Sequence, residues 1–228
     1  MNSRIYCISD IHNDADSFKQ MLSLINFKAE DMLYIVGDVF DRGPKPKELY
    51  EEIRKYSNIV CLKGNHDDWL AKYIFERHQR GIKMPYFYNT YVELLKSMNE
   101  KELLELTEWI EAMPLYVNVE VDGRQFQLVH AQASSQPEKE SKGFFLMDGE
   151  GYYDFLRNGI EGVISVVGHY PTMRILKEFS LAVPTKAQIW INDPGNVYVI
   201  DCGNGYRKRG EGGRLGCLCL NDYREYYV

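Results

Sequence analysis

The stretch LYIVGDVFDRGP, residues 33–44, joins an apolar run typical of a buried strand to a loop that carries two acids and an arginine. The run ends at Gly37, and the loop then presents Asp38, Asp41 and Arg42 before a Gly-Pro pair turns the chain. Charged side chains at the mouth of an apolar strand are costly to hold together unless something uses them. The stretch therefore indicates a functional site at the end of a buried strand.

Two further apolar runs, residues 4–9 and 58–63, lie on either side of this stretch in the sequence. Helical patterns over residues 14–26 and 46–56 separate the three runs. Because strands alternate with helices, we expect a parallel sheet that is covered by helices.

The rest of the chain predicts a mostly helical insertion over residues 67–112, followed by a second set of strands. Residues 115–130 have the pattern of a hairpin with Asp122-Gly123 at its turn. Further strands are expected at residues 162–168, 196–203, 213–222 and 224–228. Since the sequence has no internal repeat and no linker, we expect residues 1–228 to form one α/β domain of two packed sheets with helices outside.

The composition is that of an ordinary globular protein, with 45% hydrophobic and 26% charged residues. No segment approaches the ~20 apolar residues of a membrane span, and the N-terminus has no signal-peptide pattern, so a cytoplasmic protein without a membrane partner is expected. The net charge of −6 argues against binding to a nucleic-acid duplex. A phosphorylated substrate remains compatible with this charge because bound metal ions reverse the local sign. The sequence makes no prediction of oligomeric state.

The five cysteines are an odd number and include no CxxC pair. They are expected to be reduced thiols, buried or half-buried, rather than disulfides or zinc ligands. Cys217 and Cys219 should face the same side of one strand.

Polar side chains follow each apolar run at the point where the strand is expected to end. The first run is followed by Asp10 and His12, and the third by Asn65 and His66. His130 and His169 follow later runs. Only His78, in a polar helical stretch, has the pattern of a surface histidine. Ligands of open α/β sheets bind beyond the carboxyl ends of the strands, so these side chains are expected to form one site.

Oxygen and imidazole ligands without a thiolate favour manganese, iron or zinc in a catalytic role over a structural zinc. The ligands are too numerous for one ion but suit two divalent ions ~3.5–4 Å apart that share a carboxylate. We expect Asp38 to be the shared ligand. Asp10 and His12 would complete one site, and the other would be completed by Asn65, His130 and His169.

The blocks DIH, GDVFDRG, GNHD, HA and GHYPT occur in this order between Asp10 and Gly203. Together they resemble the calcineurin-like metallophosphoesterases, and the DRG form resembles the phosphoprotein (serine/threonine) phosphatase branch, especially its small bacterial and phage members. The resemblance implies a four-layer α/β/β/α sandwich of two mixed sheets with a dinuclear metal centre between them, and manganese is the metal expected there.

The resemblance also implies roles for individual residues. His66 would donate a proton to the leaving oxygen with Asp41 as its partner, and Arg42 would hold the phosphate. Asn65 would contact the phosphate as well as a metal ion. Arg157 is the one arginine between His130 and His169, where the family places a second phosphate-binding arginine.

Three functions are consistent with this sequence. The first is metal-dependent hydrolysis of phosphate monoesters, with a phosphoprotein, phosphopeptide or small phosphoester as substrate. The second is a symmetrical dinucleoside tetraphosphatase, which needs a nucleoside platform. The aromatic cluster PYFYNTY, residues 85–91, is a candidate platform, although it suits a helix-packing core equally well. The third is a non-catalytic metal- or nucleotide-binding module, which predicts a broken ligand set that this sequence does not have.

Three other features have simpler interpretations. Asp67 and Asp68 are expected to be helix-start acids, and Trp69 a core residue of that helix. The loop over residues 204–214 contains several glycines and basic residues. It favours a flexible hairpin connection over a phosphate-binding loop.

Overall fold

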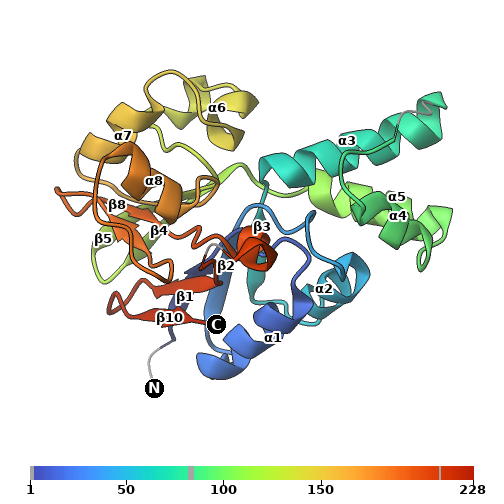
Figure 1. Ribbon diagram of the computed structural model, residues 1–228, viewed down its shortest axis with the longest axis horizontal. Coiled ribbons are helices and arrows are strands. Elements are labelled where there is room, and N and C mark those ends of the chain that lie inside the picture. Colours follow the sequence, from blue (N-terminus) through green and yellow to red (C-terminus); the bar gives the residue numbers. More distant parts are fainter. Residues whose placement is uncertain (1–2, 82–84, 211) are drawn as a thin grey trace.

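The computed structural model describes residues 3–81, 85–210 and 212–228, which form two five-stranded mixed sheets with helices on their outer faces (Figure 1). The first sheet has the order β10-β9-β1-β2-β3, with β1 at Ile5–Ile8, β2 at Met32–Val36, β3 at Ile59–Leu62, β9 at Gly216–Cys219 and β10 at Glu225–Tyr227. The second has the order β4-β5-β6-β8-β7, with β4 at Tyr116–Val121, β5 at Arg124–Val129, β6 at Ile164–Val167, β7 at Trp190–Ile191 and β8 at Val197–Val199.

Helices cover both outer faces of the pair of sheets. Those on the side of the first sheet are α1 Ala15–Leu24, α2 Pro46–Ile53, α3 Asn65–Arg80, α4 Thr90–Leu95 and α5 Glu100–Glu111. Those on the side of the second are α6 Lys142–Leu146, α7 Tyr152–Asn158 and α8 Thr172–Glu178. Two short 3₁₀ helices, η1 Pro137–Lys139 and η2 Asn204–Arg209, lie in loops.

Three apolar layers hold these elements together. Between the sheets, Val36 and Leu62 of the first sheet pack in the same cluster as Phe126 and Leu128 of the second. A larger cluster joins the outer face of the first sheet to the helices around it, and a third joins the second sheet to α6, α7 and α8. The predicted four-layer α/β/β/α arrangement is therefore confirmed.

Each sheet contains three parallel strands, and the loops after these strands carry the predicted site residues. In the first sheet β1, β2 and β3 are parallel, and in the second β5, β6 and β8 are parallel. Backbone contacts beyond the strands connect their carboxyl ends: Asp10 N–H donates to Gly37 O (3.1 Å) and Gly168 N–H donates to His130 O (2.9 Å). The loops after β1 and β2 therefore meet, and so do those after β5 and β6.

The helical insertion forms an arm of α3, α4 and α5 that extends to one side of the sandwich (Figure 1). The predicted helix-start role of Asp67 is confirmed, because its carboxylate accepts the Gly64 N–H at the start of α3 (2.9 Å). The α5 helix begins with a capping box between Asn99 and Glu102. Most of the described residues from 65 to 111 are therefore helical, and residues 82–84 lie outside the described residues.

Several sequence predictions are tested by these elements. The hairpin is confirmed, since Val121 pairs with Arg124 across the predicted turn. All five cysteines are free and buried, as predicted. No helix within the described ranges has the length and apolarity that a membrane crossing requires.

Two predictions about local structure are wrong. The 204–214 loop is not a hairpin connection, because β8 and β9 belong to different sheets and η2 lies between them; residue 211 is outside the described residues. Trp69 is not a core residue, since it is 39% exposed and its ring lies 4.9 Å from that of His66. Periodicity alone placed it on the wrong face of α3. The short elements β7, α6 and α8 were not predicted, because two to seven residues carry too little periodicity.

Candidate metal centre and active site

The loops that carry the site adopt an unusual backbone conformation. Eleven non-glycine residues in the described part of the chain have a positive φ. Seven of them lie in these loops: Asp10, His12, Asn13, Asp38, Asp41, Arg42 and His169. Each such residue costs on the order of 1–3 kcal/mol, which persists only where the surrounding structure imposes it. The folded sandwich therefore holds these side chains in place at the expense of stability.

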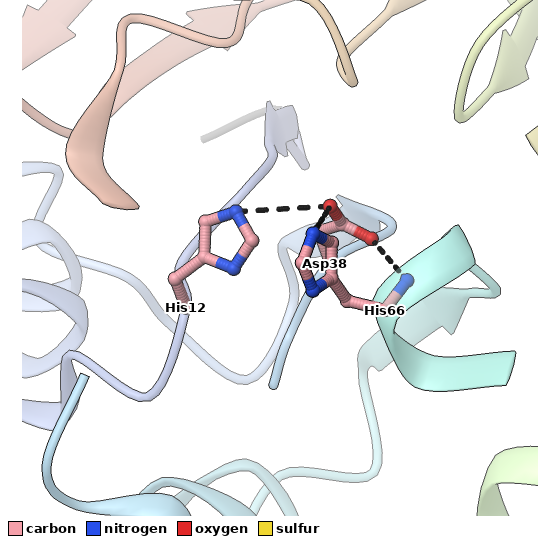
Figure 2. Close-up of side chains that lie close together, drawn as sticks. All are labelled: His12, Asp38 and His66. Atoms are coloured by element: carbon pink, nitrogen blue, oxygen red, sulfur yellow. Dashed lines mark hydrogen bonds and ion pairs between the residues drawn. The ribbon is translucent and has the colours of Figure 1, made fainter. Parts of the chain in front are cut away.

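The Asp38 carboxylate lies at the centre of the site. Its Oδ2 is 3.7 Å from His12 Nε2 and 3.9 Å from His66 Nε2, and its Oδ1 is 3.3 Å from His130 Nε2. The His66 backbone N–H donates to Oδ1 (3.0 Å). Figure 2 shows this carboxylate joined by dashed lines to a ring nitrogen of His12 and to His66, which come from the loop after β1 and the first turn of α3.

Two groups of possible metal ligands share Asp38. One consists of His12, Asp38 and His66, and the other of Asp10, Asp38 and His130, with the ligand atoms of each group within 4.8 Å of one another. Two ligands of one ion, each about 2.1 Å from it, lie roughly 3–4 Å apart. The separations around Asp38 therefore fit two cations that share this carboxylate. The groups differ from the expected ones in two members, because His66 lies in the group of His12, and Asp10 lies in the group of His130.

A buried carboxylate oxygen of Asp10 that has no hydrogen-bond partner also supports the presence of a cation in this site. Asp10 Oδ1 is buried, has no hydrogen-bond partner and lies 3.7 Å from His12 Nε2. Its other oxygen accepts from Ser9 Oγ (2.6 Å) and from His169 N–H (3.1 Å). Because a buried carboxylate oxygen without a partner is costly, a cation beside Oδ1 matches what the site lacks.

Two histidine rings are oriented by backbone carbonyls. Nδ1–H of His12 donates to Phe40 O (2.8 Å), and Nδ1–H of His130 donates to Val36 O (3.0 Å). A carbonyl only accepts, so each Nδ1 carries the hydrogen and each Nε2 presents a lone pair to the site. Burial lowers the pKa of His130 to about 4, which keeps this ring neutral and able to bind a metal.

Asn65 brings the remaining predicted ligands together. Its Oδ1 lies 2.9 Å from His130 Nε2 and 3.1 Å from His169 Nδ1. The other nitrogen of His169 lies 3.1 Å from Asp148 Oδ1. The structure thus brings all six predicted metal ligands to one site.

The proposed acid, its partner and the phosphate-binding arginine are also adjacent. Nδ1–H of His66 donates to Asp41 Oδ2 (2.8 Å), and Arg42 Nη2 donates to His66 Nε2 (2.9 Å). Arg42 Nη1 donates to His12 Nε2 (2.5 Å). Burial would lower the pKa of His66, but the carboxylates of Asp38 and Asp41 outweigh it and raise that pKa. Nε2 is therefore the atom at which this ring gains or releases a proton.

The buried acids favour a cation. Burial, followed by the charges of Asp201 and Asp38, raises the pKa of Asp10 well above its usual value. Burial also raises the pKa of Asp201 to about 6. Both shifts mean that burial makes the ionised carboxylates costly, and for Asp10 the neighbouring acids add repulsion. Divalent ions would supply positive charge beside these carboxylates. The chain as a whole does not, because its net charge is −6.

Sequence reasoning missed three residues near the site. Asp201 is buried and follows the apolar run of β8, in the same way as Asp10 follows β1, so its signal was present. The Tyr86 hydroxyl donates to Asp41 Oδ2 (2.8 Å), across 45 positions of sequence. The ring of Tyr206 lies 4.4 Å from the Arg42 guanidinium. No local pattern indicates the last two contacts.

Arg157 is not brought into this group. Its guanidinium lies over the ring of Phe179, at 4.8 Å, and no hydrogen bond or ion pair among the described residues joins it to the six ligands. Arg174 of α8 lies closer to Arg42, because both guanidinium groups contact the ring of Tyr206, Arg174 at 4.8 Å.

Comparison with known proteins agrees with this geometry. The model of the calcineurin-like phosphoesterase family matches residues 3–205. The chain therefore belongs to the calcineurin-like phosphoesterase family, which confirms the resemblance found in its motifs.

Several relatives are similar in sequence or in structure. A symmetrical bis(5'-nucleosyl)-tetraphosphatase of Acidovorax ebreus is 30% identical over 129 residues, which are 56% of this chain and 43% of that protein. The chain thus spans less than half of the length of this curated relative. A crystal structure of a putative diadenosine tetraphosphatase has a TM-score of 0.69 at 15% identity and covers 100% of this chain and 94% of its own. A serine/threonine phosphatase of Saccharomyces cerevisiae has a TM-score of 0.60 at 13% identity, with coverage of 97% and 73%. These two structures show a shared fold.

Proposed function

We propose that this chain is a metal-dependent hydrolase that cleaves symmetrical dinucleoside tetraphosphates into two nucleoside diphosphates. The observation that carries the hydrolytic part is the pairing of His66 with Asp41 beside two groups of metal ligands that share Asp38. The substrate part is supported by the relatives that are about 30% identical and are named as symmetrical tetraphosphatases.

The metal-ligand residues fit two divalent ions, for which manganese is our proposal and iron or zinc would also suit the donors. When bound, such ions lower the pKa of a water molecule and neutralise charge on the phosphate oxygens. The protein's contribution is to fix the ligands through backbone contacts and to keep the site enclosed, since Asp38 and His130 are buried.

Arg42 would bind and orient the phosphate chain. Its two terminal nitrogens now contact Nε2 of His12 and Nε2 of His66. Both contacts are replaceable, because a guanidinium forms stronger bonds to phosphate oxygens than to imidazole. Its stacking on Tyr206 would hold it in position during the exchange.

His66 would act as the proton donor. Water forms a bond to a central phosphorus atom as the bridging P–O bond breaks, and Nε2 of His66 delivers a proton to the leaving diphosphate. Asp41 holds the ring through Nδ1 and stabilises its protonated form. The attacking water releases one proton to solvent, and Nε2 of His66 regains one from solvent, so the ring is protonated again for the next cycle.

A second candidate is hydrolysis of phosphate monoesters, including phosphoserine and phosphothreonine. The motif GDVFDRG with His66 and Asp41 in contact favours it, because the same acid and arginine serve a monoester equally well. The two candidates differ in what they need beyond the phosphate. Only the first needs a place for a nucleoside.

The test compares two reactions of the manganese-loaded protein: release of ADP from diadenosine tetraphosphate and release of phosphate from a phosphoserine peptide. We expect the first to be faster, and His66→Asn to lower its kcat by about 10²-fold or more. His78→Asn is the matched control, since His78 lies on α3 outside the ligand groups. Full activity of His66→Asn would remove the assigned acid, and faster release from the phosphopeptide would favour the second candidate.

A further inference from the structure

A pocket of about 600 Å³ opens directly beside the metal-ligand cluster. His12, a member of the cluster, and Arg42, which donates to it, both line this pocket. Phe87 and Tyr88 form an aromatic part of its wall, and the rest of the lining includes Asn204 and Arg207 of η2 and the acids Asp14 and Asp16. The volume is within the range of about 300–1,000 Å³ that is usual for sites of small organic ligands.

The aromatic cluster of residues 85–91 is divided by the structure into separate roles. Tyr91 is buried in the helical arm, as a packing residue would be. Tyr86 bonds to Asp41, and the Tyr88 ring lies 4.9 Å from that of His66. Phe87 is different, because it is 95% exposed. The packing of the described residues gives no reason for an aromatic side chain at this position.

The position of Phe87 relates it to the chemistry. Tyr88 follows Phe87 in the sequence, and its ring contacts that of His66. Phe87 and Tyr88 both line the same pocket as Arg42. A molecule with a phosphate at Arg42 and a flat ring farther out would therefore bring that ring to the aromatic wall. Stacking on an exposed aromatic face suits every nucleobase, because each has a π-face.

The η2 residues that line the pocket are held in place. Asn204 Nδ2 donates to Ile11 O (2.8 Å), which ties η2 to the loop after β1. Arg207 Nη1 donates to Ser17 Oγ (2.7 Å) and lies 3.7 Å from Asp14 Oδ2, so its charge is paired with an acid that lines the same pocket. The pocket thus combines a fixed polar wall with an aromatic wall, as a nucleoside with attached phosphates requires.

We propose that Phe87 and Tyr88 form a stacking wall for one base of the substrate, while the phosphate chain of that nucleoside enters at Arg42. This inference deepens the proposed function and rests on it, since it names the part of the protein that selects a nucleotide over a plain phosphate ester. Phe87 acts as a specificity residue and not in the chemical step.

The test is Phe87→Ala, with Phe75→Ala as a matched control because Phe75 is also an exposed phenylalanine, on α3. The readout is kcat/KM for diadenosine tetraphosphate divided by kcat/KM for phosphoserine, which has no aromatic ring. We expect Phe87→Ala to lower this ratio by about 5- to 100-fold, mostly through KM, because loss of one base stack weakens binding by that factor. Phe87→Trp should restore it. An unchanged ratio in Phe87→Ala overturns the proposal.

Failure of the proposed function is recognised separately. If the wild-type protein does not hydrolyse diadenosine tetraphosphate, that function fails, and the wall is judged by calorimetric binding of ADP and of pyrophosphate in manganese. The wall stands if Phe87→Ala weakens ADP binding by about 5-fold or more relative to pyrophosphate, and Phe75→Ala does not. It falls if Phe87→Ala binds both as the wild type does.

Discussion

The residues around Asp38, which we call the inner end of the site, and those around Phe87, the outer end, are connected by a pocket that His12, Arg42 and Phe87 line. The two ends differ in almost every physical respect. Asp38 and His66 are each 2% exposed, whereas Phe87 is 95% exposed. Asp38 has a positive φ and is surrounded by histidines on loops that follow the strands. Phe87 lies between α3 and α4, outside both sheets.

This difference follows from what each end must do. Metal ligands have to be fixed to a few tenths of an ångström, which the carboxyl ends of parallel strands and buried hydrogen bonds achieve. A side chain that selects among ligands needs exposure, and a loop on the helical arm provides it. Changes at the inner end should therefore abolish chemistry or stability, and changes at the outer end should alter substrate preference.

The largest effect is expected for Asp38→Asn. An amide cannot bridge two cations as a carboxylate does, and it also loses the charge that the surrounding histidines face. We expect metal content to fall and kcat to drop by at least about 10³-fold, because stabilisation of charge by bound ions is worth several kcal/mol. Metal analysis of the purified protein and steady-state kinetics measure both.

Asp193→Asn is the matched control for this prediction. Asp193 is exposed in the turn between β7 and β8, at the end of β8 opposite to Asp201. Its variant should keep the metal and the activity of the wild type. Should Asp38→Asn retain two ions per chain, the central role of this carboxylate would be refuted, and with it the contrast between the two ends.

The two ends also differ in how far sequence reasoning reaches them. Asp10 and His66 could be predicted, because each follows an apolar run and the carboxyl ends of parallel strands meet. Asp201 obeys the same rule, but one acid after one strand is too common to be assigned. The contact of Tyr86 with Asp41 depends on the path of the chain between α3 and α4, which returns to the loop after β2, and no local pattern encodes that path. The same is true of the exposure of Phe87.

The second prediction concerns the close packing behind the inner end. Gly37 has φ +82°, and a Cβ atom there would overlap the ring of His130. We expect Gly37→Ala to lower the free energy of unfolding by about 3 kcal/mol, the combined cost of backbone strain and overpacking. Urea denaturation measures it.

Gly123→Ala separates these two causes. Gly123 lies in the hairpin turn with φ +74°, and a Cβ there would meet no atom within 4 Å. Its variant should therefore show the strain alone and lose about 1 kcal/mol. Equal losses in the two variants would mean that contact with His130 does not constrain Gly37.

The third prediction addresses the boundary between the two ends, where Tyr86 of the aromatic cluster bonds to Asp41. Burial and the Asp41 carboxylate raise the pKa of Tyr86, so its hydroxyl stays protonated and donates. We expect Tyr86→Phe to lower kcat by about 2- to 10-fold, the effect of one lost hydrogen bond on the positioning of His66.

Tyr50→Phe is the control, because the Tyr50 hydroxyl on α2 accepts from Arg54, the C-cap residue of that helix, outside the site. Its kcat should equal that of the wild type. A change in KM alone for Tyr86→Phe would assign this residue to the substrate wall instead of to the support of Asp41.

The smallest effect is expected where the arm that carries Phe87 is tied to the second sheet. Asp68 of α3 pairs with Lys142 of α6 and with Lys72, whose Nζ is 2.9 Å from Asp68 Oδ2. Burial would raise the pKa of Asp68, but the hydrogen bonds from these lysines outweigh it and lower that pKa. Lys142 is 39% exposed, so solvent weakens the pair, and Asp68→Asn should cost about 0.5–1 kcal/mol at pH 7.

The dependence of this cost on pH identifies its origin. A carboxyl group whose pKa is lower in the folded than in the unfolded chain stabilises the fold above its unfolded pKa of about 4, and this contribution is lost as the pH falls through the folded pKa. The difference in unfolding free energy between the wild type and Asp68→Asn should therefore shrink between pH 5 and pH 3, as followed by urea denaturation. Lys142→Met closes a double-mutant cycle that isolates the pair from other effects. A difference that stays constant over this range would mean that packing, and not the ionised pair, ties the arm to the sheet. The arm would then support Phe87 more rigidly than we expect from its contrast with the buried residues of the inner end.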